Sequence, residues 1–244
     1  MKVVLDIETL QASRKHWADL VGIDSGPEDT TSGKTLPGNL FEYSEHEMRR
    51  QKEEESYQRS AFDGTFSRIV VIGLLVFSDS MEPQESLSWY GENEAELLGR
   101  FWRKVGELRP NLWITHNGLG FDLPFLKKRS VIHQIKPPVD LNLARFRTDP
   151  VYDTMAVWSN WDTRGWVKLD VLARALGVAT KSGSGAEVAD MWIKKDKKDV
   201  ALYCLQDTYV TYACYCRMTY REVQSPEVVL GGTNCICVDK PPAG

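Results

Sequence analysis

The sequence predicts an α/β protein in which one sheet is covered by helices. Three β-branched or apolar segments stand early in the chain, helix and strand patterns then alternate, and helical patterns follow. This order is typical of a sheet packed against helices. The 244 residues are 42% hydrophobic and 26% charged, ordinary values for a globular protein with a substantial core. We therefore expect a single domain over residues 1–244, with an insertion at 23–66 and a tail at 222–244.

Four segments have the length and composition of strands. Residues 3–7 (VVLDI) are short and β-branched, and residues 69–77 (IVVIGLLVF) form a second run of the same kind. Residues 86–90 follow a turn-like stretch, and residues 112–116 (LWITH) have the apolar character of a buried strand. We expect these four segments to lie in the sheet.

Helical patterns alternate with the later strands and then follow them. Residues 94–108 carry apolar side chains at helical spacing, and Pro110 ends that pattern. Residues 123–129 predict a short helix, and the segments 168–176 and 197–221 predict two further helices. Helices in these places would cover the sheet.

The connection at 23–66 is much longer than a hairpin requires. Its early part, 25–39, is rich in Gly, Pro, Thr and Ser, whereas its later part is highly charged and contains good helix formers. We expect an insertion at the edge of the sheet, with a helix over residues 42–57.

Asp6 and Glu8 stand two residues apart in the first predicted strand. Residues at that spacing point to the same side of a strand, while Val3, Leu5 and Ile7 point to the other. Like charges this close repel one another unless a cation lies between them, and rigidly held oxygen ligands suit Mg²⁺ or Mn²⁺. The alternative is an edge strand with a solvated acidic face.

Asp122 follows a predicted buried strand and stands where a helix begins, with Pro124 in the first turn. Asp is a favoured N-cap residue, so capping is one interpretation. The ends of strands in open sheets are also where active-site residues gather, which is the other interpretation. Asn117, on the same loop, would either reach a substrate or hold the loop in place.

Tyr203 and Asp207 lie four residues apart in a predicted helix. Residues at that spacing lie on one face, so the phenol and the carboxylate can converge on one site. The alternative is an exposed Asp beside a Tyr of the core.

In combination, these motifs resemble the DEDD superfamily of 3′–5′ exonucleases, which have the ribonuclease H-like fold. Three motifs appear in order: DIET at 6–9, HNGLGFD at 116–122 and YCLQD at 203–207. Tyr203 stands where the sister branch has His, as in the DEDDy type. The segments YDTM at 152–155 and KLDVLARALGV are also similar to the exonuclease domain of family B DNA polymerases.

The resemblance spans about residues 1–220, and it implies a mixed sheet flanked by helices and a two-metal 3′–5′ exonuclease. It implies that Asp6, Glu8 and Asp207 hold one Mg²⁺ or Mn²⁺ ion. A second ion would be held by Asp6 and by Asp122, directly or through water. The product would be a nucleoside 5′-monophosphate.

The resemblance also implies roles for residues that bind no metal. Tyr203 would orient the attacking water, because a phenol is a poor base at neutral pH. Thr9 and Leu10 would contact the terminal nucleotide, and Phe121 is a candidate surface for base stacking. Asp153 resembles a supporting acidic position of the family, although it could equally cap a helix.

Nucleic acid is the expected substrate, with DNA favoured over RNA because of the likeness to polymerase-associated domains. The alternatives are a 3′–5′ exoribonuclease and a catalytically silent nucleic-acid-binding module, which should have lost one or more of the ligands present here. The net charge of −4 argues against a broad clamp on the phosphate backbone. The basic runs 127–129 and 194–198 are either local phosphate contacts or solvated helix faces.

The five cysteines all lie between Cys204 and Cys237, in an odd number that does not suit a disulfide framework. Cys214 and Cys216 stand two apart in a helical pattern and so do not share a face, which argues against a structural zinc site. No apolar run is long enough to span a membrane, and the N-terminus is a poor secretory signal. We therefore expect a cytoplasmic protein without a membrane segment.

Overall fold

The computed structural model describes residues 1–23, 40–179, 188–194 and 196–239. Six strands form one mixed sheet in the order β5-β4-β1-β2-β3-β6. β1 pairs antiparallel with β2, and β2 with β3, whereas β4 is parallel to both β1 and β5, and β6 is parallel to β3. The strands are β1 (Lys2–Leu10), β2 (Arg68–Phe77), β3 (Pro83–Tyr90), β4 (Leu112–Thr115), β5 (Val151–Asp153) and β6 (Asn234–Cys237).

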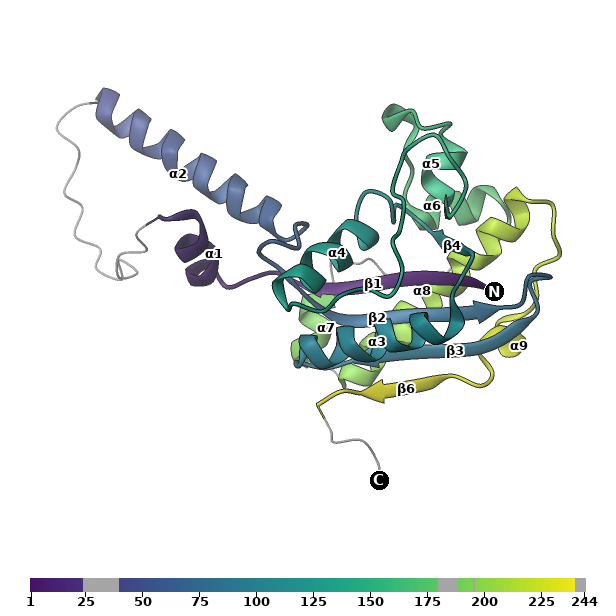
Figure 1. Cartoon of the computed structure of the whole chain (residues 1–244). Helices are drawn as coiled ribbons and strands as arrows, with labels where there is room; N and C mark the ends of the chain where they lie inside the picture. The colour runs from purple at the N-terminus through teal and green to yellow at the C-terminus, as the bar shows by residue number, and fades with distance from the viewer. Residues whose placement is uncertain (24–39, 180–187, 195, 240–244) are drawn as a thin grey trace.

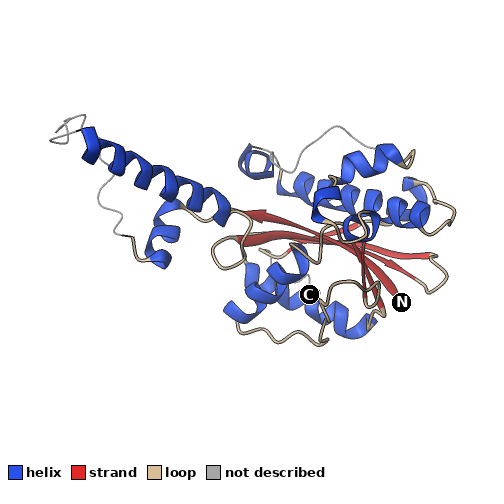
Figure 2. Cartoon of the chain, turned by 90° about the horizontal axis from the view of Figure 1, so that it is seen from above, coloured by secondary structure: helices blue, strands red, loops and turns tan. Residues whose placement is uncertain are grey.

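Helices cover both faces of this sheet, as Figure 2 shows. The alternation of side chains along β1 separates the two layers, because Val3 and Leu5 pack with α3 and α4 while Val4 packs with α8. The mixed sheet between helices confirms the predicted α/β class and is consistent with a ribonuclease H-like exonuclease fold. The body helices are α3 (Glu94–Leu108), α4 (Asp122–Ile132), α5 (Thr154–Trp158), α6 (Leu169–Ala175), α7 (Val188–Lys194), α8 (Lys197–Met218) and α9 (Pro226–Leu230).

An arm of two helices connects β1 to β2: α1 (Arg14–Val21) precedes the predicted insertion at 23–66, and α2 (Leu40–Ser60) lies within it. Figure 1 shows both helices projecting together from the end of β1 and the start of β2, which are inner strands, so the arm does not lie at an edge of the sheet as predicted. The predicted helix is confirmed and is longer than expected, α1 was not predicted, and the Gly- and Pro-rich stretch at 25–39 lies outside the described residues. Below, "the arm" means α1 and α2.

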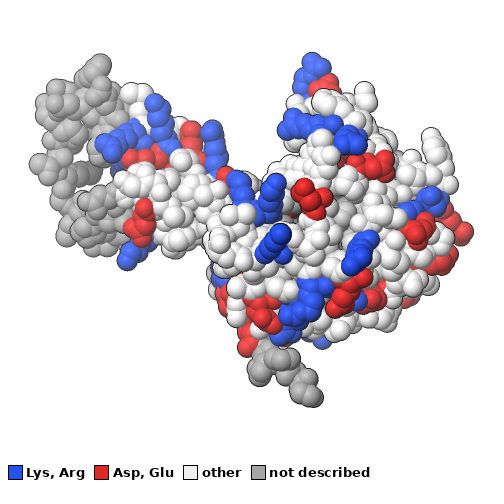
Figure 3. Space-filling view, viewed as in Figure 1, with Lys and Arg blue, Asp and Glu red and all other residues white. Residues whose placement is uncertain are grey.

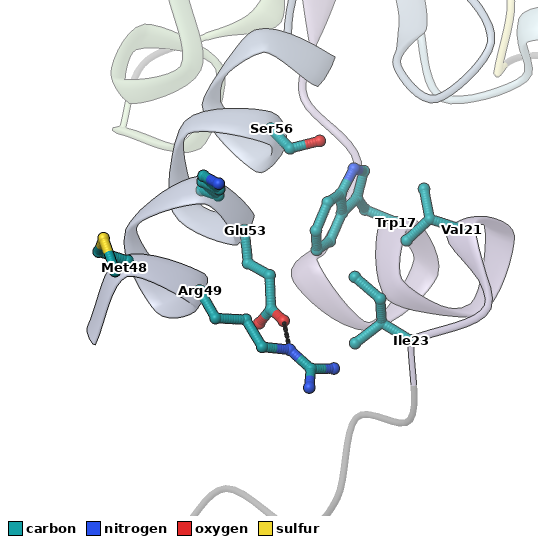
Figure 4. A pocket seen from close by; sticks show the side chains of 8 residues that line it. Trp17, Val21, Ile23, Met48, Arg49, Glu53 and Ser56 are labelled. Carbon is teal, nitrogen blue, oxygen red and sulfur yellow. Dashed lines mark hydrogen bonds and ion pairs between the residues drawn. The ribbon is translucent and has the colours of Figure 1, made fainter. Parts of the chain in front are cut away.

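The base of the arm is held by contacts of α2 with α1 and with the segment that precedes α1. The Tyr57 hydroxyl donates to the carbonyl of Ala12 at 3.0 Å, and the Gln11 amide donates to the carbonyl of Tyr57 at 2.7 Å. The ring of Trp17 meets that of Tyr57 edge-on, with centroids 5.6 Å apart. Further out, Val21 and the other side chains drawn in Figure 4 line a pocket between α1 and α2.

Element ends differ from the predicted bounds by a few residues, and several short elements were not predicted. The predicted helix at 94–108 coincides with α3 at both ends. The predicted helix at 197–221 ends earlier, at Met218, and α4 begins before and ends after the predicted 123–129. In the described part of the chain, no helix combines the length and the apolar character needed to cross a bilayer.

Candidate active site

β1 carries Asp6 and Glu8 on the face that is covered by α8. Side chains alternate along a strand, so both carboxylates follow Val4 and point away from the layer of α3 and α4. Glu8 is buried, and Asp6 is half-buried. The pairing of β1 with β2 shifts in register between Glu8 and Thr9, so the regular ladder is interrupted just beyond the two carboxylates.

Asp122 is the first residue of α4, and its side chain points back to β1. The main-chain N–H of Ile7 donates to Asp122 Oδ1 at 3.1 Å. The N-cap position of α4 is Phe121, which makes no side-chain capping bond. The capping interpretation of Asp122 is therefore wrong, and its buried carboxylate is instead fixed beside Asp6 and Glu8.

α8 brings Tyr203 and Asp207 to these carboxylates from the opposite face of the sheet to α3 and α4. The helix begins after Asp196, whose side chain accepts a hydrogen bond from the N–H of Lys198 at 2.9 Å. From there it crosses β1 and β2 with Tyr203 and Asp207 one turn apart and half-buried. The negative charge of Asp207 raises the pKa of Asp6 and Glu8, so Asp207 faces the two carboxylates of β1.

Burial raises the pKa of all four carboxyl groups, and repulsion by neighbouring carboxylates adds to the rise for Asp6 and Glu8. Burial is the largest cause for each; for Asp6 and Glu8 the neighbouring carboxylates raise the pKa further, to well above its ordinary value. Burial raises the pKa of Asp122 to about 7, against the opposing effect of the Ile7 hydrogen bond. Burial raises the pKa of Asp207 to about 6, and the nearby Tyr203 hydroxyl opposes that rise.

The donor set of this cluster suits a divalent cation. Among the described residues, none of the four carboxylates forms an ion pair with a Lys, Arg or His side chain. Ligand atoms of Asp6, Glu8 and Cys204 lie within 4.8 Å of one another. Closely grouped carboxylate oxygens without a cationic partner are the environment that hard cations such as Mg²⁺ and Mn²⁺ prefer. The cluster therefore suits a divalent cation, with the ligand atoms of Asp6 and Glu8 in its closest group.

Cys204 was not identified from the sequence as a residue of this site. Its thiol donates to Asp6 Oδ2 at 3.3 Å from a fully buried position on α8. Its position in the predicted helix could have identified it. Cys204 precedes Asp207 by three residues and therefore lies on nearly the same helix face.

Asp153 supports the loop that leads to Asp122. Its carboxylate caps α5 by accepting from the N–H groups of Met155 and Ala156 at 3.1 and 3.2 Å. The same carboxylate accepts from the N–H groups of Asn117 and Leu119, both at 2.9 Å. The capping and the supporting interpretations of Asp153 are thus compatible, because one buried side chain makes both sets of bonds.

Asn117 shapes that loop through its backbone. Its φ is 62°, in the left-handed region, and its carbonyl accepts from the N–H groups of Gly120 and Phe121 at 3.0 and 2.9 Å. The Asn117 side chain lies over Gly120, where an added Cβ would come within 2.6 Å of Asn117 Oδ1. Of the two roles considered for Asn117, these contacts correspond to holding the loop.

Phe121 and Phe62, which follows α2 at the base of the arm, form an aromatic surface beside the cluster. The ring of Phe121 meets Phe125 at 5.4 Å and Phe62 at 6.5 Å between centroids. Phe62 is 74% exposed and was not identified from the sequence. Thr9 and Leu10 end β1 on the same strand as Asp6, and Leu10 packs partly against the core around α7.

Many charges of the predicted basic runs are neutralised by neighbours. Arg129 makes two hydrogen bonds to the buried Glu94, at 2.9 and 2.6 Å, and is therefore structural. Lys128 pairs with Asp63 at 2.5 Å, whereas Lys127 is exposed. Figure 3 shows Lys and Arg interspersed with Asp and Glu, and a hollow between the arm and the part of the molecule around α5.

Ion pairs also occupy the second basic run. Lys194 pairs with Asp190 at 2.8 Å, and Lys197 pairs with Glu92 at 2.6 Å. For these two lysines the structure favours the interpretation as a helix surface over that of phosphate contacts.

Comparison with known proteins gives a match to one family model, described as a predicted 3′–5′ exonuclease related to the exonuclease domain of PolB. The model matches residues 60–226, which include Asp122, Tyr203 and Asp207 but begin after Asp6 and Glu8.

Curated relatives with similar sequences are DNA polymerases. The chain is 30% identical over 142 residues to a catalytic subunit of DNA polymerase epsilon from Arabidopsis thaliana, over 53% of this chain and 6% of the plant protein. It is 28% identical over 139 residues to a DNA polymerase of Pyrococcus glycovorans, over 49% of this chain and 17% of that protein. A DNA polymerase of Thermococcus aggregans is 32% identical over 145 residues, 49% of this chain and 8% of its own length. The alignments therefore cover only a small part of each polymerase.

Proposed function

The chain belongs to the family of predicted 3′–5′ exonucleases related to the exonuclease domain of PolB, and from that premise we propose that it removes nucleotides from the 3′ ends of DNA. Single-stranded ends are the proposed substrate, and nucleoside 5′-monophosphates are the proposed products. The observation that carries this proposal is the convergence of four carboxylates from β1, α4 and α8, which pair with no Lys, Arg or His side chain in the described part of the chain.

The carboxylates have separate proposed roles in metal binding. Asp6, Glu8 and Asp207 would hold one Mg²⁺ or Mn²⁺ ion. Asp6 and Asp122 would hold a second. Bound there, the two ions would supply a lowered pKa for the attacking water and stabilisation of negative charge on the departing 3′ oxygen. The protein keeps these ligands in place through the rigid strand β1 and the bond from Ile7 to Asp122.

Tyr203 would orient the attacking water from α8. Burial raises the pKa of its hydroxyl, and the negative charges of Asp207 and Glu8 raise it further. The phenol therefore stays protonated at neutral pH and acts as a hydrogen-bond donor and acceptor, not as a base. This property supports positioning of the water by Tyr203 as its role.

The terminal nucleotides would lie over the aromatic surface and the end of β1. Phe121 and the exposed Phe62 offer faces on which bases of any sequence can stack. Thr9 and Leu10 follow the carboxylates on the same strand and would contact the last nucleotide. The hollow between the arm and the part of the molecule around α5 (Figure 3) is the proposed path of the single strand.

A nuclease assay with end-labelled substrates tests the proposal. Single- and double-stranded DNA and RNA, labelled at either end, would each be incubated with Mg²⁺, Mn²⁺ or EDTA. We expect 5′-labelled single-stranded DNA to give a ladder that shortens from the 3′ end with either metal and not with EDTA. Preferential digestion of RNA would replace DNA as the substrate, and full activity in EDTA would overturn the metal-dependent mechanism.

A further inference from the structure

Cys204 makes a specific contact with the central carboxylate of the cluster. Its Sγ lies 3.3 Å from Asp6 Oδ2 and 3.4 Å from the main-chain oxygen of Asp6, although the two residues are far apart in sequence. The thiol is fully buried between α8 and the sheet. Within the described residues it is the one side chain that donates a hydrogen bond to the Asp6 carboxylate.

The sheet leaves room for this thiol at one glycine. Gly73 of β2 stands opposite Asp6 in the antiparallel pairing of β1 and β2. A Cβ at Gly73 would lie 2.8 Å from Cys204 Sγ, closer than real Cβ contacts allow. A side chain on β2 at this point would therefore displace the thiol from Asp6.

We propose that Cys204 is a positioning residue, whose thiol holds the Asp6 carboxylate in the orientation required for binding the divalent cation. This inference rests on the proposed metal-dependent function. Asp6 is repelled by three neighbouring carboxylates and is steadied by no Lys, Arg or His among the described residues. Groups that hydrogen-bond to a metal ligand commonly set its orientation, and their loss weakens metal binding.

Two other roles for the thiol make different predictions. Sγ is close enough to the oxygens of Asp6 and Glu8 to serve as a direct ligand. Mg²⁺ and Mn²⁺ prefer oxygen ligands, however, and the thiol already donates its proton to Asp6. The other role is that of a small apolar side chain filling the core, in which case only stability depends on it.

The test is Mn²⁺ affinity of the folded, full-length chain without nucleic acid, measured by electron paramagnetic resonance of the free ion. Cys204→Ala removes the donor, and we expect it to weaken Mn²⁺ binding about tenfold. Cys204→Ser keeps a donor with a shorter reach, and we expect it to recover part of that loss. Gly73→Ala should weaken binding as well, since it displaces the thiol from the opposite side.

Cys214→Ala is the matched control. Cys214 is also fully buried on α8, but it packs against Leu172 and Ala173 instead of the carboxylates. Cys214→Ala should therefore lower the melting temperature about as much as Cys204→Ala does and leave the affinity for Mn²⁺ unchanged.

The outcomes separate this inference from the proposed function. If Asp6→Asn loses Mn²⁺ binding while Cys204→Ala binds as tightly as the natural protein, Cys204 has no positioning role and the metal site stands. If Cys204→Ser weakens binding as much as Cys204→Ala, a hydrogen-bond donor is not what the site requires. Failure of the natural protein to bind Mn²⁺ would overturn the proposed function and this inference together.

Discussion

The main-chain N–H of Ile7 donates to Asp122 Oδ1 at 3.1 Å, and so the first turn of α4 is tied to β1 between Asp6 and Glu8. One hydrogen bond therefore joins two motifs that are 115 residues apart in sequence. The bond also opposes the rise in the Asp122 pKa that burial causes. The cluster thus owes its geometry to the backbone as well as to the carboxylates themselves.

Removing a carboxylate should stop catalysis. Asp6→Ala and Asp207→Ala each delete a proposed metal ligand that no neighbour replaces, and we expect cleavage of labelled single-stranded DNA to fall to the background of the assay. The control is Asp199→Asn. Asp199 is an exposed acidic residue in the first turn of α8, and this variant should cleave at the natural rate. Near-natural turnover by Asp6→Ala would mean that the active site lies elsewhere.

Tyr203→Phe should slow the reaction without abolishing it. The variant keeps the ring that packs beside Trp192 and Val200 and loses only the hydroxyl. Because misplacement of a reacting group costs up to about 100-fold in rate, we expect kcat to fall by about 10- to 100-fold with little change in KM. Activity at the level of Asp207→Ala would instead assign the phenol a direct chemical role.

The raised pKa values predict how stability depends on pH when metal is removed by a chelator. The folded-state pKa of Asp122 is about 7 and that of Asp207 about 6, against ordinary values of 3.8. The folded protein therefore holds these protons more tightly than the unfolded chain. The resulting stability is present below about pH 4 and is lost as the pH rises through about 6 and 7.

Thermal melting measures this effect. In chelator, the melting temperature of the natural protein should fall between about pH 5 and pH 8, and the fall should be smaller in Asp122→Asn, whose amide does not ionise. Added Mn²⁺ should raise the melting temperature more at about pH 8 than at about pH 5, because protons compete with the metal for the carboxylates. An equal metal effect at both pH values would argue against binding at this cluster.

Asp153→Ala should damage both stability and activity. Its carboxylate accepts hydrogen bonds from the main chain of the 117–119 loop and of the first turn of α5. Loss of a cap and of acceptors for buried N–H groups should cost about 2–3 kcal/mol in the free energy of unfolding. Asp162 also caps a helical turn but is exposed, so Asp162→Ala should destabilise the protein much less than Asp153→Ala does.

Activity separates a local effect of Asp153 from a global one. Below its melting temperature, Asp153→Ala should still cleave more slowly, since the loop that leads to Asp122 has lost its anchor. Natural activity at low temperature would show that Asp153 is a stabilising residue alone.

Periodic patterns explain which parts of the molecule the sequence could predict. α3 was placed at both ends because apolar residues recur at helical spacing over 94–108 and Pro110 ends the pattern; the structure adds the Asn93 cap at its start. α1 buries only Trp17 and Ala18, which leaves no periodic signal, and β5 has three residues.

The acidic motifs could be predicted from the sequence for the same reason, the regular spacing of their residues. Asp6 with Glu8, and Tyr203 with Asp207, have the spacing of one strand face and one helix face. Contacts such as that between Cys204 and Asp6 depend on how α8 crosses β1, and no local pattern encodes them. The same holds for Phe62, which meets Phe121 only because the arm returns beside the loop before α4.

The arm supplies the last prediction, because it begins after β1 and returns to β2 beside it, with Leu10 paired to Arg68. We hypothesise that α2 contacts the phosphates of the incoming strand. Arg50 and Lys52 are exposed there, and Arg49 is 77% exposed although it pairs with Glu53 at 3.0 Å. Three acidic residues follow Lys52 on the same helix, so the surface is mixed in charge and any attraction is local.

Changing Arg49, Arg50 and Lys52 together to Ala should raise KM on single-stranded DNA and leave kcat nearly unchanged, because these side chains would bind the strand away from the reacting atoms. The dependence of affinity on salt should become shallower by about one unit of slope for each phosphate that is no longer bound. Glu53→Gln is the matched control, since it frees Arg49 from its ion pair without removing a basic side chain, and KM should not rise. If the triple variant has natural KM and salt dependence on both single- and double-stranded substrates, the arm binds no phosphate, and its surface helix is tolerated because long insertions cost little free energy.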